Sequence, residues 1–585
     1  MPVTYEPPIR SMRFILDHVV DFDAQMAALP GCEDVSAEFA EEMLTMAGRM
    51  CAERLAPLNM SGDRQGAKLV NGKVVTADGF ADAYAEFVEA GWASLSGDPE
   101  YGGQGLPRTL QIMLDELVSA ANMSFGLFPG LTRGAAEALA EHGSKELKAR
   151  YLPKLTRGEW CGAMALTEAH AGTDLGLLRT KAEPFGDGSY KVTGTKIFIS
   201  SGDQDFGNNI IHLVLARLPD AVPGVKGISL FLVPKLLPGE AGEPMGENGV
   251  TVGALEHKMG IHAQPTCVMN YEEAQGWLIG EPGRGLNAMF TMMNAERLFV
   301  GIQGLGLAEV AVQNAVAYAK DRLQGRAPDG SGPASIIHHA DVRRMILLGR
   351  SFIEPARALA AWTALRMDVA AKHPNEAERA AAHADVALLT PVVKAAFTDM
   401  GFETTVHAQQ VFGGHGYVWE AGMEQFVRDA RIAQIYEGTN GVQAIDLVTR
   451  KVMMDGGRPL AAYLDRIAAD LGEGADELEE WLLPEARAAL VSLRKASAVV
   501  QSNTSIEAMG AAAVNYLRLF AITSLGWIWV RIARASLEYG DLATKERNLA
   551  LAKFYAVHVL PQTEALEASI AAGPEAVMAL DAELF

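Results

Sequence analysis

Two motifs follow one another between residues 409 and 440, Gln409-Gln-Val-Phe-Gly-Gly-His-Gly-Tyr-Val-Trp419 and Arg428-Asp-Ala-Arg-Ile-Ala-Gln-Ile-Tyr-Glu-Gly-Thr-Asn440. The Gly-Gly-x-Gly turn lets backbone pass close to a ligand, because glycine carries no Cβ. Glu437 stands immediately before a periodic helical run, and Asn440 is placed as its N-cap. On spacing alone, a carboxylate that favours the helix dipole is a commoner explanation of Glu437 than a catalytic base.

An earlier segment, Met164-Ala-Leu-Thr-Glu-Ala-His-Ala-Gly-Thr-Asp174, combines small residues with hydroxyls beside Gly172. Backbone N–H groups in such a segment can approach a phosphate or a heteroaromatic ring. Taken alone, an ordinary Gly/Asp turn that leads into a strand is the more frequent explanation. The segment therefore gains meaning only in combination with others.

A third segment, Gly194-Thr-Lys-Ile-Phe-Ile-Ser-Ser-Gly202, reads as a β-strand. A period of two puts Ile197 and Ile199 on one face, and Phe198 and Ser200 on the other. An aromatic plane and a hydroxyl on one face could pack against a flat cofactor ring, although most strand aromatics belong to a core.

Length and composition exclude several classes of protein. The 585 residues are 49% hydrophobic and 21% charged, which is typical of a globular chain with three or four domains. Fifty Lys and Arg against 72 Asp and Glu give a net charge of −22, which disfavours nucleic acid and anionic lipid as partners. Four cysteines without a CxxC pair indicate neither a zinc site nor a disulfide framework, so we expect no metal and a reducing, cytoplasmic location.

No membrane span or secretory signal is expected from the sequence. The start, Met1-Pro-Val-Thr-Tyr-Glu-Pro-Pro, lacks a basic stretch followed by an apolar run. The apolar run between Arg518 and Arg531 has 12 residues, well short of the roughly 20 that span a bilayer.

Periodicity divides the chain into five segments. Phe39, Met43, Met46 and Met50 recur at helical steps after Ser36, a well-placed N-cap. Alternating runs follow at Tyr190 to Ser200, Ile210 to Leu218 and Gly227 to Val233, and helical periodicity then returns. We expect an N-terminal extension over 1–35, a helical domain over 36–160, a β domain over 161–285, a second helical domain over 286–455 and an additional helical domain over 456–585.

The motifs in this order resemble the acyl-CoA dehydrogenases over about residues 36 to 455. The resemblance implies an α+β fold, with an N-terminal helical domain, a central β domain and a C-terminal four-helix domain, here followed by an additional C-terminal helical domain. The matching motifs are Leu166-Thr-Glu-Ala-His-Ala-Gly-Thr-Asp174, Lys196-Ile-Phe-Ile-Ser200, Gly413-Gly-His-Gly416, Arg428-Asp-Ala-Arg431 and Ile435-Tyr-Glu-Gly-Thr439.

The resemblance implies oxidation of an acyl-CoA thioester between its α- and β-carbons. Glu437 matches the base that removes the α-proton, while the β-carbon gives a hydride to flavin N5. The α-C–H is a very weak acid, so the carboxylate must reach it in a water-poor pocket. The N–H of Gly438, with a ribityl hydroxyl of the flavin, matches the pair that stabilises charge on the thioester oxygen.

The same resemblance implies FAD as the cofactor. Phe198 stands where tryptophan is more usual and Ser200 where threonine is, so both swaps keep an aromatic plane and a hydroxyl. The residues implied to contact FAD are Met164, Leu166, Thr167, Gly172, Thr173, Phe198, Ser200, Arg322, Gln410, Gly413, Gly414 and Thr439. Because Gln410, Gly413, Gly414 and Arg322 match contacts made across a dimer interface, a homodimer is implied as well.

Several positions depart from the family pattern. Gly441 and His339 stand at or near positions where glutamine is expected, and Leu323-Gln-Gly-Arg326 replaces an aromatic-Gly pair after Arg322. On the substrate side, Thr173, Asn294 and Arg297 match residues that touch CoA or line its channel, although Arg297 could equally form a helix-surface ion pair.

The two extensions resemble those of larger bacterial members of the family, in particular those that oxidise 3-methylmercaptopropionyl-CoA to methylthioacryloyl-CoA in dimethylsulfoniopropionate catabolism. A short- or medium-chain or aryl acyl-CoA is the alternative substrate. An electron-transfer flavoprotein is the expected electron acceptor. The motifs do not distinguish such a dehydrogenase from an oxidase that passes its electrons to O₂.

Two other functions of the same fold are disfavoured. DNA-binding relatives use a basic C-terminal domain, whereas residues 456–585 hold 11 Lys and Arg against 17 Asp and Glu. Membrane attachment requires a helix with a Lys-rich face, but the run from Val514 to Ile532 is apolar nearly all round and contains Trp527 and Trp529. We expect that run to be a buried packing helix.

Overall fold

The computed structural model describes residues 3–239, 243–327, 329–472, 477–503 and 505–585. The chain forms two compact units. The first unit contains residues 1–49, 107–120 and 300–585, and the second contains residues 50–106 and 121–299. The architecture is α+β, as predicted, with the strands of the main sheet confined to the second unit.

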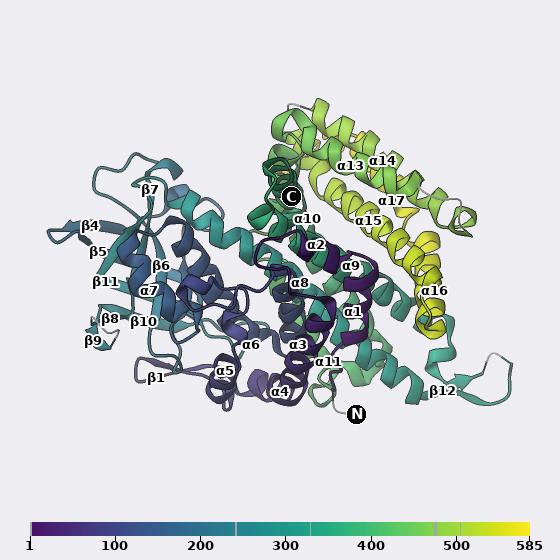
Figure 1. Ribbon diagram of the computed structural model, residues 1–585, viewed down its shortest axis with the longest axis horizontal. Coiled ribbons are helices and arrows are strands. Elements are labelled where there is room, and N and C mark those ends of the chain that lie inside the picture. Colours follow the sequence, from purple (N-terminus) through teal and green to yellow (C-terminus); the bar gives the residue numbers. More distant parts are fainter. Residues whose placement is uncertain (1–2, 240–242, 328, 473–476, 504) are drawn as a thin grey trace. The chain divides into compact units, whose positions relative to one another are not determined.

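A seven-stranded sheet forms the centre of the second unit (Figure 1). Its path runs β10-β11-β5-β4-β6-β3, and β7 pairs with both β11 and β6. Most pairs are antiparallel, whereas β6 pairs in parallel with β3 and β4. The strands are β3 (Cys161–Ala165), β4 (Lys181–Phe185), β5 (Ser189–Ser200), β6 (Ile210–Arg217), β7 (Ile228–Pro234), β10 (Val250–Leu255) and β11 (Thr266–Ile279).

Helices pack against this sheet through an apolar core. Buried residues of α7 (Lys145–Thr156), such as Tyr151 and Leu155, share one cluster with Leu213 and Leu230 of the sheet. The long helix α6 (Arg108–His142) has a kink at Asn122, where φ is −162° and ψ is 92°. The Asn122 Oδ1 atom accepts a hydrogen bond from the N–H of Phe125 at 3.0 Å, and so acts as a cap for the part of α6 that follows the kink.

The first unit is helical. Its central helix, α15, packs against α9, α10, α12, α14, α16 and α17. Trp527 and Trp529 of α15 are both buried, and their indole N–H groups donate to Asp470 at 2.6 Å and to the carbonyl of Ser351 at 2.8 Å. The prediction of a buried packing helix is therefore confirmed. The bounds are α9 (Ala340–Lys372), α10 (Glu376–Val411), α11 (Met423–Ala433), α12 (Asn440–Asp446), α13 (Arg458–Gly472), α14 (Leu483–Ser502), α15 (Ile506–Glu538), α16 (Leu542–His558) and α17 (Gln562–Ala571).

The N-terminal segment differs in part from expectation. The extension forms α1 (Ile9–His18) and α2 (Phe22–Ala27), followed by α3 (Ala37–Met50). Ser36 caps α3 as predicted, since its Oγ accepts from the N–H of Phe39 at 3.1 Å. The predicted apolar stripe is wrong in part, because Phe39 and Met46 are exposed and small residues such as Ala40 and Ala47 are buried instead. The small size of alanine lets neighbouring elements approach that face closely.

Two hairpins appear where the sequence indicated helix or loop. β1 (Lys68–Val70) and β2 (Lys73–Val75) interrupt the expected helical segment, because Asn71 and Gly72 both take positive φ and make a two-residue turn. β12 (Leu323–Arg326) and β13 (Pro333–Ser335) pair within the second helical domain that was expected over 286–455.

Among the residues that the structure describes, three helices have the length and composition to cross a membrane: α8 (Gly285–Asp321), α10 and α15. Between 67% and 89% of their apolar windows is buried. The absence of a span stays a prediction.

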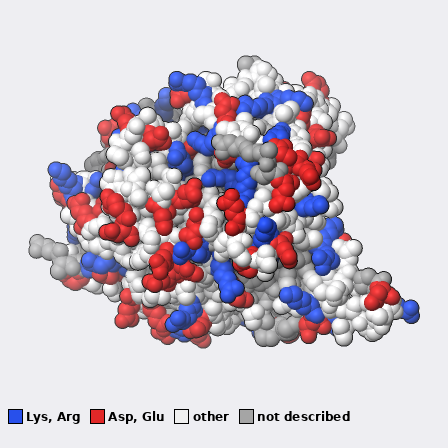
Figure 2. Space-filling model, turned by 45° about the vertical axis from the view of Figure 1, so that its right-hand side comes forward, with Lys and Arg blue, Asp and Glu red and all other residues white. Residues whose placement is uncertain are grey.

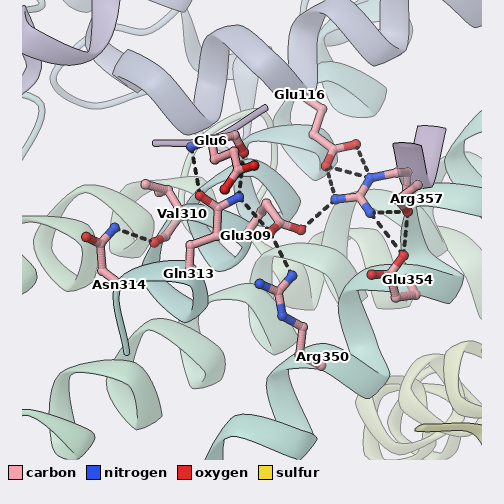
Figure 3. Close-up of polar contacts among 10 residues, drawn as sticks. Glu6, Glu116, Glu309, Val310, Gln313, Asn314, Arg350, Glu354 and Arg357 are labelled. Carbon is pink, nitrogen blue, oxygen red and sulfur yellow. Dashed lines mark hydrogen bonds and ion pairs between the residues drawn. The ribbon is translucent and has the colours of Figure 1, made fainter. Parts of the chain in front are cut away.

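A buried charge cluster ties the N-terminal extension to the helices of the first unit. The guanidinium of Arg357 donates to Glu116 at 2.6 Å and to Glu309 at 2.7 Å (Figure 3). It also donates to the hydroxyl of Ser11, which donates in turn to Glu354 at 2.5 Å. Each of these residues is buried. Residues 3–35 are therefore an integral part of this unit.

Candidate active site

The predicted flavin-facing segments lie side by side in the second unit. The N–H of Ile197 donates to the carbonyl of Thr167 at 2.9 Å, which joins the two motifs by their backbones. Lys196 adds a second link, because its Nζ donates to the carbonyl of Leu166 at 2.9 Å. Met164 and Thr167 are half-buried, whereas Leu166 is buried. The structure thus unites Met164, Leu166 and Thr167 with the strand that bears Phe198 and Ser200.

Phe198 does not follow the strand alternation that the sequence predicted. Its φ is +59°, and β5 bulges there, because the register with β11 shifts between Cys267 and Met269. The predicted shared face of Ile197 and Ile199 is therefore wrong: Ile199 is buried and Ile197 only half-buried. The bulge leaves the Phe198 ring 59% exposed. An exposed aromatic in a left-handed conformation is costly by itself, which is typical of a residue held for a ligand.

The loop after the first motif is closed by Glu168. Its carboxylate accepts hydrogen bonds from the N–H groups of Arg179 and Thr180, at 2.8 and 2.9 Å, and from the Thr180 hydroxyl at 2.6 Å. Gly172 and Thr173 lie exposed on this loop. A Cβ on Gly172 would touch only the Thr167 side chain, at 3.9 Å, so there is open space above it.

A buried ion pair supports both segments from beneath. Lys196 Nζ lies 2.9 Å from Glu168 Oε1, and both side chains are buried. Burial alone would raise the pKa of Glu168, but the Lys196 charge and the hydrogen bonds to the carboxylate outweigh it and lower the pKa to about 2. Burial lowers the pKa of Lys196 to about 8, against the opposing effect of Glu168. Both residues lie within the sequence motifs, but the motifs predicted no role for either of them.

The Glu437 loop lies in the first unit, between α11 and α12. Glu437 and Gly438 both have positive φ, +58° and +83°. The Gly438 position favours glycine for its conformation, and a Cβ there would lie 2.6 Å from Gln443 Nε2, so the Gln443 amide would have to move. Gln443 Nε2 also donates to the carbonyl of Glu437 at 3.1 Å. Glu437 is half-buried, and its Oε2 atom is shielded from solvent.

The cap of α12 differs from the prediction. Thr439 is the N-cap, since its Oγ1 accepts from the N–H of Val442 at 3.3 Å. Asn440 was the predicted cap, but its side-chain amide instead donates to Thr398 Oγ1 at 2.9 Å and to Asp399 at 2.6 Å on α10. The predicted contact of Thr439 with a flavin phosphate stays a prediction.

The residues predicted to contact FAD across a dimer interface, Arg322, Gln410, Gly413 and Gly414, also lie in the first unit. The Tyr318 ring, four residues before Arg322, stacks on Phe412 with 4.1 Å between centroids. The Tyr318 hydroxyl lies 2.8 Å from His415 Nδ1. These contacts place the end of α8, with Arg322, beside the segment that holds Gln410, Gly413 and Gly414. A Cβ would meet nothing within 4 Å at either glycine, so both are open.

The predicted substrate residues Asn294 and Arg297 lie on α8, within the second unit. The Arg297 guanidinium donates to Asn294 Oδ1 at 3.3 Å, and its Cζ atom lies 5.9 Å from the centroid of the Phe290 ring. The guanidinium and the amide are therefore neighbours one helical turn apart.

Charges of both signs are mixed on the face of the molecule that Figure 2 shows. Figure 2 shows Lys and Arg interspersed with Asp and Glu on the face in view, without a broad basic area. Over the ranges that the structure describes, no group of three His, Cys, Asp or Glu side chains could hold a metal ion.

Four family models match consecutive parts of the chain. They are the acyl-CoA dehydrogenase N-terminal domain over residues 38–159, the middle domain over 163–274, the C-terminal domain over 283–453, and an acetyl-CoA dehydrogenase C-terminal-like domain over 460–581. The last match covers most of the additional helical domain.

Characterised relatives match along almost the whole chain. The 3-methylmercaptopropionyl-CoA dehydrogenase of Ruegeria pomeroyi is 43% identical over 575 residues, which is 96% of this chain and 97% of the relative. The broad-specificity linear acyl-CoA dehydrogenase FadE5 of Mycobacterium tuberculosis is 33% identical over 99% of this chain and 100% of the relative.

Solved structures share the fold. An acyl-CoA dehydrogenase from Bacillus anthracis, solved with FAD, superposes with a TM-score of 0.77 at 21% identity, over 95% of this chain and 91% of that one. The predicted fold class and enzyme class are confirmed. With all four domain models matched in order and a 43% identical relative along its length, the chain belongs to the acyl-CoA dehydrogenase family.

Proposed function

We propose that this chain is an FAD-dependent dehydrogenase that converts 3-methylmercaptopropionyl-CoA to methylthioacryloyl-CoA. The observation that carries the reaction type is the conformation of two residues, Phe198 and Glu437. Both are non-glycine residues held at positive φ. Strain of this kind persists where surrounding contacts impose it, and it gathers at functional sites. The relative from Ruegeria pomeroyi supports the choice of substrate.

The residues present fit FAD. The exposed ring of Phe198 offers a flat apolar surface, and the hydroxyl of Ser200 follows it on the same strand. The open backbone at Gly413 and Gly414, beside Arg322, suits a phosphate-bearing nucleotide. When bound, FAD supplies the acceptor for the hydride from the β-carbon.

The remaining chemistry belongs to the chain. Glu437 takes the proton from the α-carbon, and its Oε2 atom is shielded from solvent. The N–H of Gly438 stabilises negative charge on the thioester oxygen. Asn294, Arg297 and Thr173 hold the CoA portion and so fix the acyl chain in place.

The assembly and partners belong to the same proposal. The chain acts as a homodimer in the cytoplasm, with an electron-transfer flavoprotein as electron acceptor. Tyr417, Val418 and Trp419 are 83%, 45% and 67% exposed beside the glycine turn, and three such side chains in a row favour burial against a second copy.

An anaerobic titration tests the reaction and the substrate together. The purified flavoprotein is titrated with 3-methylmercaptopropionyl-, butyryl-, octanoyl- and phenylpropionyl-CoA while the flavin absorbance is followed. We expect bleaching at the lowest concentration with 3-methylmercaptopropionyl-CoA. If another thioester bleaches the flavin at a lower concentration, that thioester replaces 3-methylmercaptopropionyl-CoA as the proposed substrate. If none of the four bleaches the flavin, the proposed dehydrogenase activity is rejected. Release of peroxide under air would identify an oxidase instead.

A further inference from the structure

Lys394 is a fully buried cation beside the Glu437 loop. It lies on α10 with 0% exposure, and its Nζ donates to the carbonyl of Gly438 at 2.8 Å and to Asn440 Oδ1 at 2.8 Å. The ammonium therefore holds the loop on both sides of Thr439. A buried ammonium is costly, and so it is retained where its contacts compensate for the lost hydration.

The loop needs such a support. Glu437 and Gly438 form two successive left-handed residues, and this conformation is unfavourable for the glutamate by itself. The side-chain amide of Gln443 holds the carbonyl of Glu437, and Lys394 holds the next carbonyl along the chain. Consecutive carbonyls are thereby fixed by two side chains from different helices, which sets the direction in which the Glu437 side chain leaves the backbone.

Asn440 connects this support to α10. Its Oδ1 accepts from Lys394, while its Nδ2 donates to Asp399 at 2.6 Å. Asp399 also accepts from Gln434 Nε2 at 2.7 Å, at the start of the same loop. The loop from Gln434 to Asn440 is thus tied to a single helix face at both ends.

We propose that Lys394 is a positioning residue for the base Glu437, acting through the Gly438 carbonyl and Asn440. The inference rests on the proposed function. Removal of the ammonium frees the loop from its two left-handed residues, and the carboxylate then leaves the α-carbon. Because misplacement of a reacting group by about 1 Å can cost about 100-fold in rate, the effect falls on proton removal rather than on binding.

The test is the K394M holoenzyme, compared with K394R and with T404V as a matched control. Thr404 is buried on the same helix, and its hydroxyl donates to the Met400 carbonyl of that helix at 2.7 Å. Two quantities are measured per bound flavin. One is kcat, and the other is the absorbance of the long-wavelength band that the enzyme forms with a 3-thia acyl-CoA. In that probe sulfur replaces the β-carbon, so it can lose its α-proton but cannot give a hydride.

We expect K394M to lose about 100-fold in kcat and most of the band, with KM little changed. K394R should restore part of both, and T404V should keep both even where its melting temperature falls. If K394M keeps the band and the rate of T404V, Lys394 is only structural and the inference is overturned.

Two further arms keep the test decisive. If K394M does not fold, N440A removes the bridging amide and is expected to weaken the band in the same way, while an unchanged band in N440A would overturn the inference. The wild-type enzyme tests the proposed function: if it forms no band and oxidises no thioester, the proposed function fails. A K394M variant that matches an active wild-type enzyme overturns only the inference about Lys394.

Discussion

Lys196 Nζ lies 2.9 Å from the carbonyl oxygen of Leu166 and equally close to the carboxylate of Glu168. One buried ammonium thereby fixes the backbone of the first flavin-facing segment to the strand of the second. We expect K196M to destabilise the enzyme by about 3–5 kcal/mol, because Glu168 would be left buried without its cation. The free energy of unfolding in urea and the flavin content measure this.

The matched control for K196M lies on the same strand. Lys191 pairs with the exposed Glu273 at 2.6 Å, so K191M should cost only about 0–1 kcal/mol. Equal effects of K191M and K196M would show that the buried pair contributes no more than a surface pair.

Phe198 gives a second prediction, for cofactor affinity. An exposed ring that stacks on a flat ligand contributes about 0.5–1.5 kcal/mol beyond its buried area. We therefore expect F198A to weaken FAD binding to the apoprotein by about threefold to tenfold, and F198W to preserve it. Fluorescence titration with FAD measures both. F185A is the control, because Phe185 is 47% exposed on β4 of the same sheet; F198A binding FAD as tightly as F185A would remove Phe198 from the site.

Local patterns predicted part of the β domain. The runs at β5, β6 and β7 alternate or are continuously apolar, and all three strands form. β11 was missed because bulges interrupt its period: the register with β5 shifts between Tyr271 and Ala274, where Glu273 takes a positive φ. A bulge adds an unpaired residue and reverses the faces beyond it, so a fixed period cannot follow the strand.

The site was predictable only as a set of motifs. Glu437 and Phe198 were identified through resemblance, but their left-handed conformations come from contacts that no motif encodes. Lys394 lies 44 residues from Gly438 in the sequence, and a lone lysine in an apolar helix carries no local signal of its partner. Buried polar partners of this kind are decided by tertiary packing, which puts them outside the reach of periodicity.

Glu437 carries the third prediction. E437Q should keep the bound flavin but lose about 100- to 10,000-fold in kcat, because an amide cannot accept the α-proton. The control is E420Q, an exposed glutamate on the short helix Trp419–Ala421 that should leave kcat unchanged. Retained flavin with an unchanged rate in E437Q would exclude this residue as the base.

His212 predicts how the stability of the second unit depends on pH. Its Nε2 lies 2.9 Å from the Gly202 carbonyl, and its Nδ1 lies 2.8 Å from the Tyr271 hydroxyl. A carbonyl only accepts, so we assign the proton to Nε2, and Nδ1 accepts from Tyr271. Burial lowers the pKa of His212 to about 4.

The lowered pKa of His212 determines the direction in which the stability changes with pH. Because the unfolded value is about 6.5, the stabilisation is complete above pH 6.5 and is lost as the pH falls through 4, by up to about 3 kcal/mol. Unfolding measured between pH 7.5 and 4 should show this loss in the wild type and in H257Q, whose histidine is exposed on the same unit. H212Q should lose less unfolding free energy over this pH range. If the pH profile of H212Q were identical to that of the wild type, His212 would be ruled out as the source of the loss.

Arg357 gives the last prediction, for the first unit. Its guanidinium bonds Glu116, Glu309 and the Ser11 hydroxyl with 1% of the side chain exposed, so R357M would leave buried carboxylates without their cation. We expect a loss of about 3–5 kcal/mol in the free energy of unfolding. R344M on the same helix removes an exposed pair with Asp341 and should cost about 0–1 kcal/mol. Since Ser11 belongs to the N-terminal extension, R357M should also expose residues 1–35 to limited proteolysis sooner than R344M does. Equal stability and equal cleavage rates in the two variants would mean that the cluster does not hold the extension.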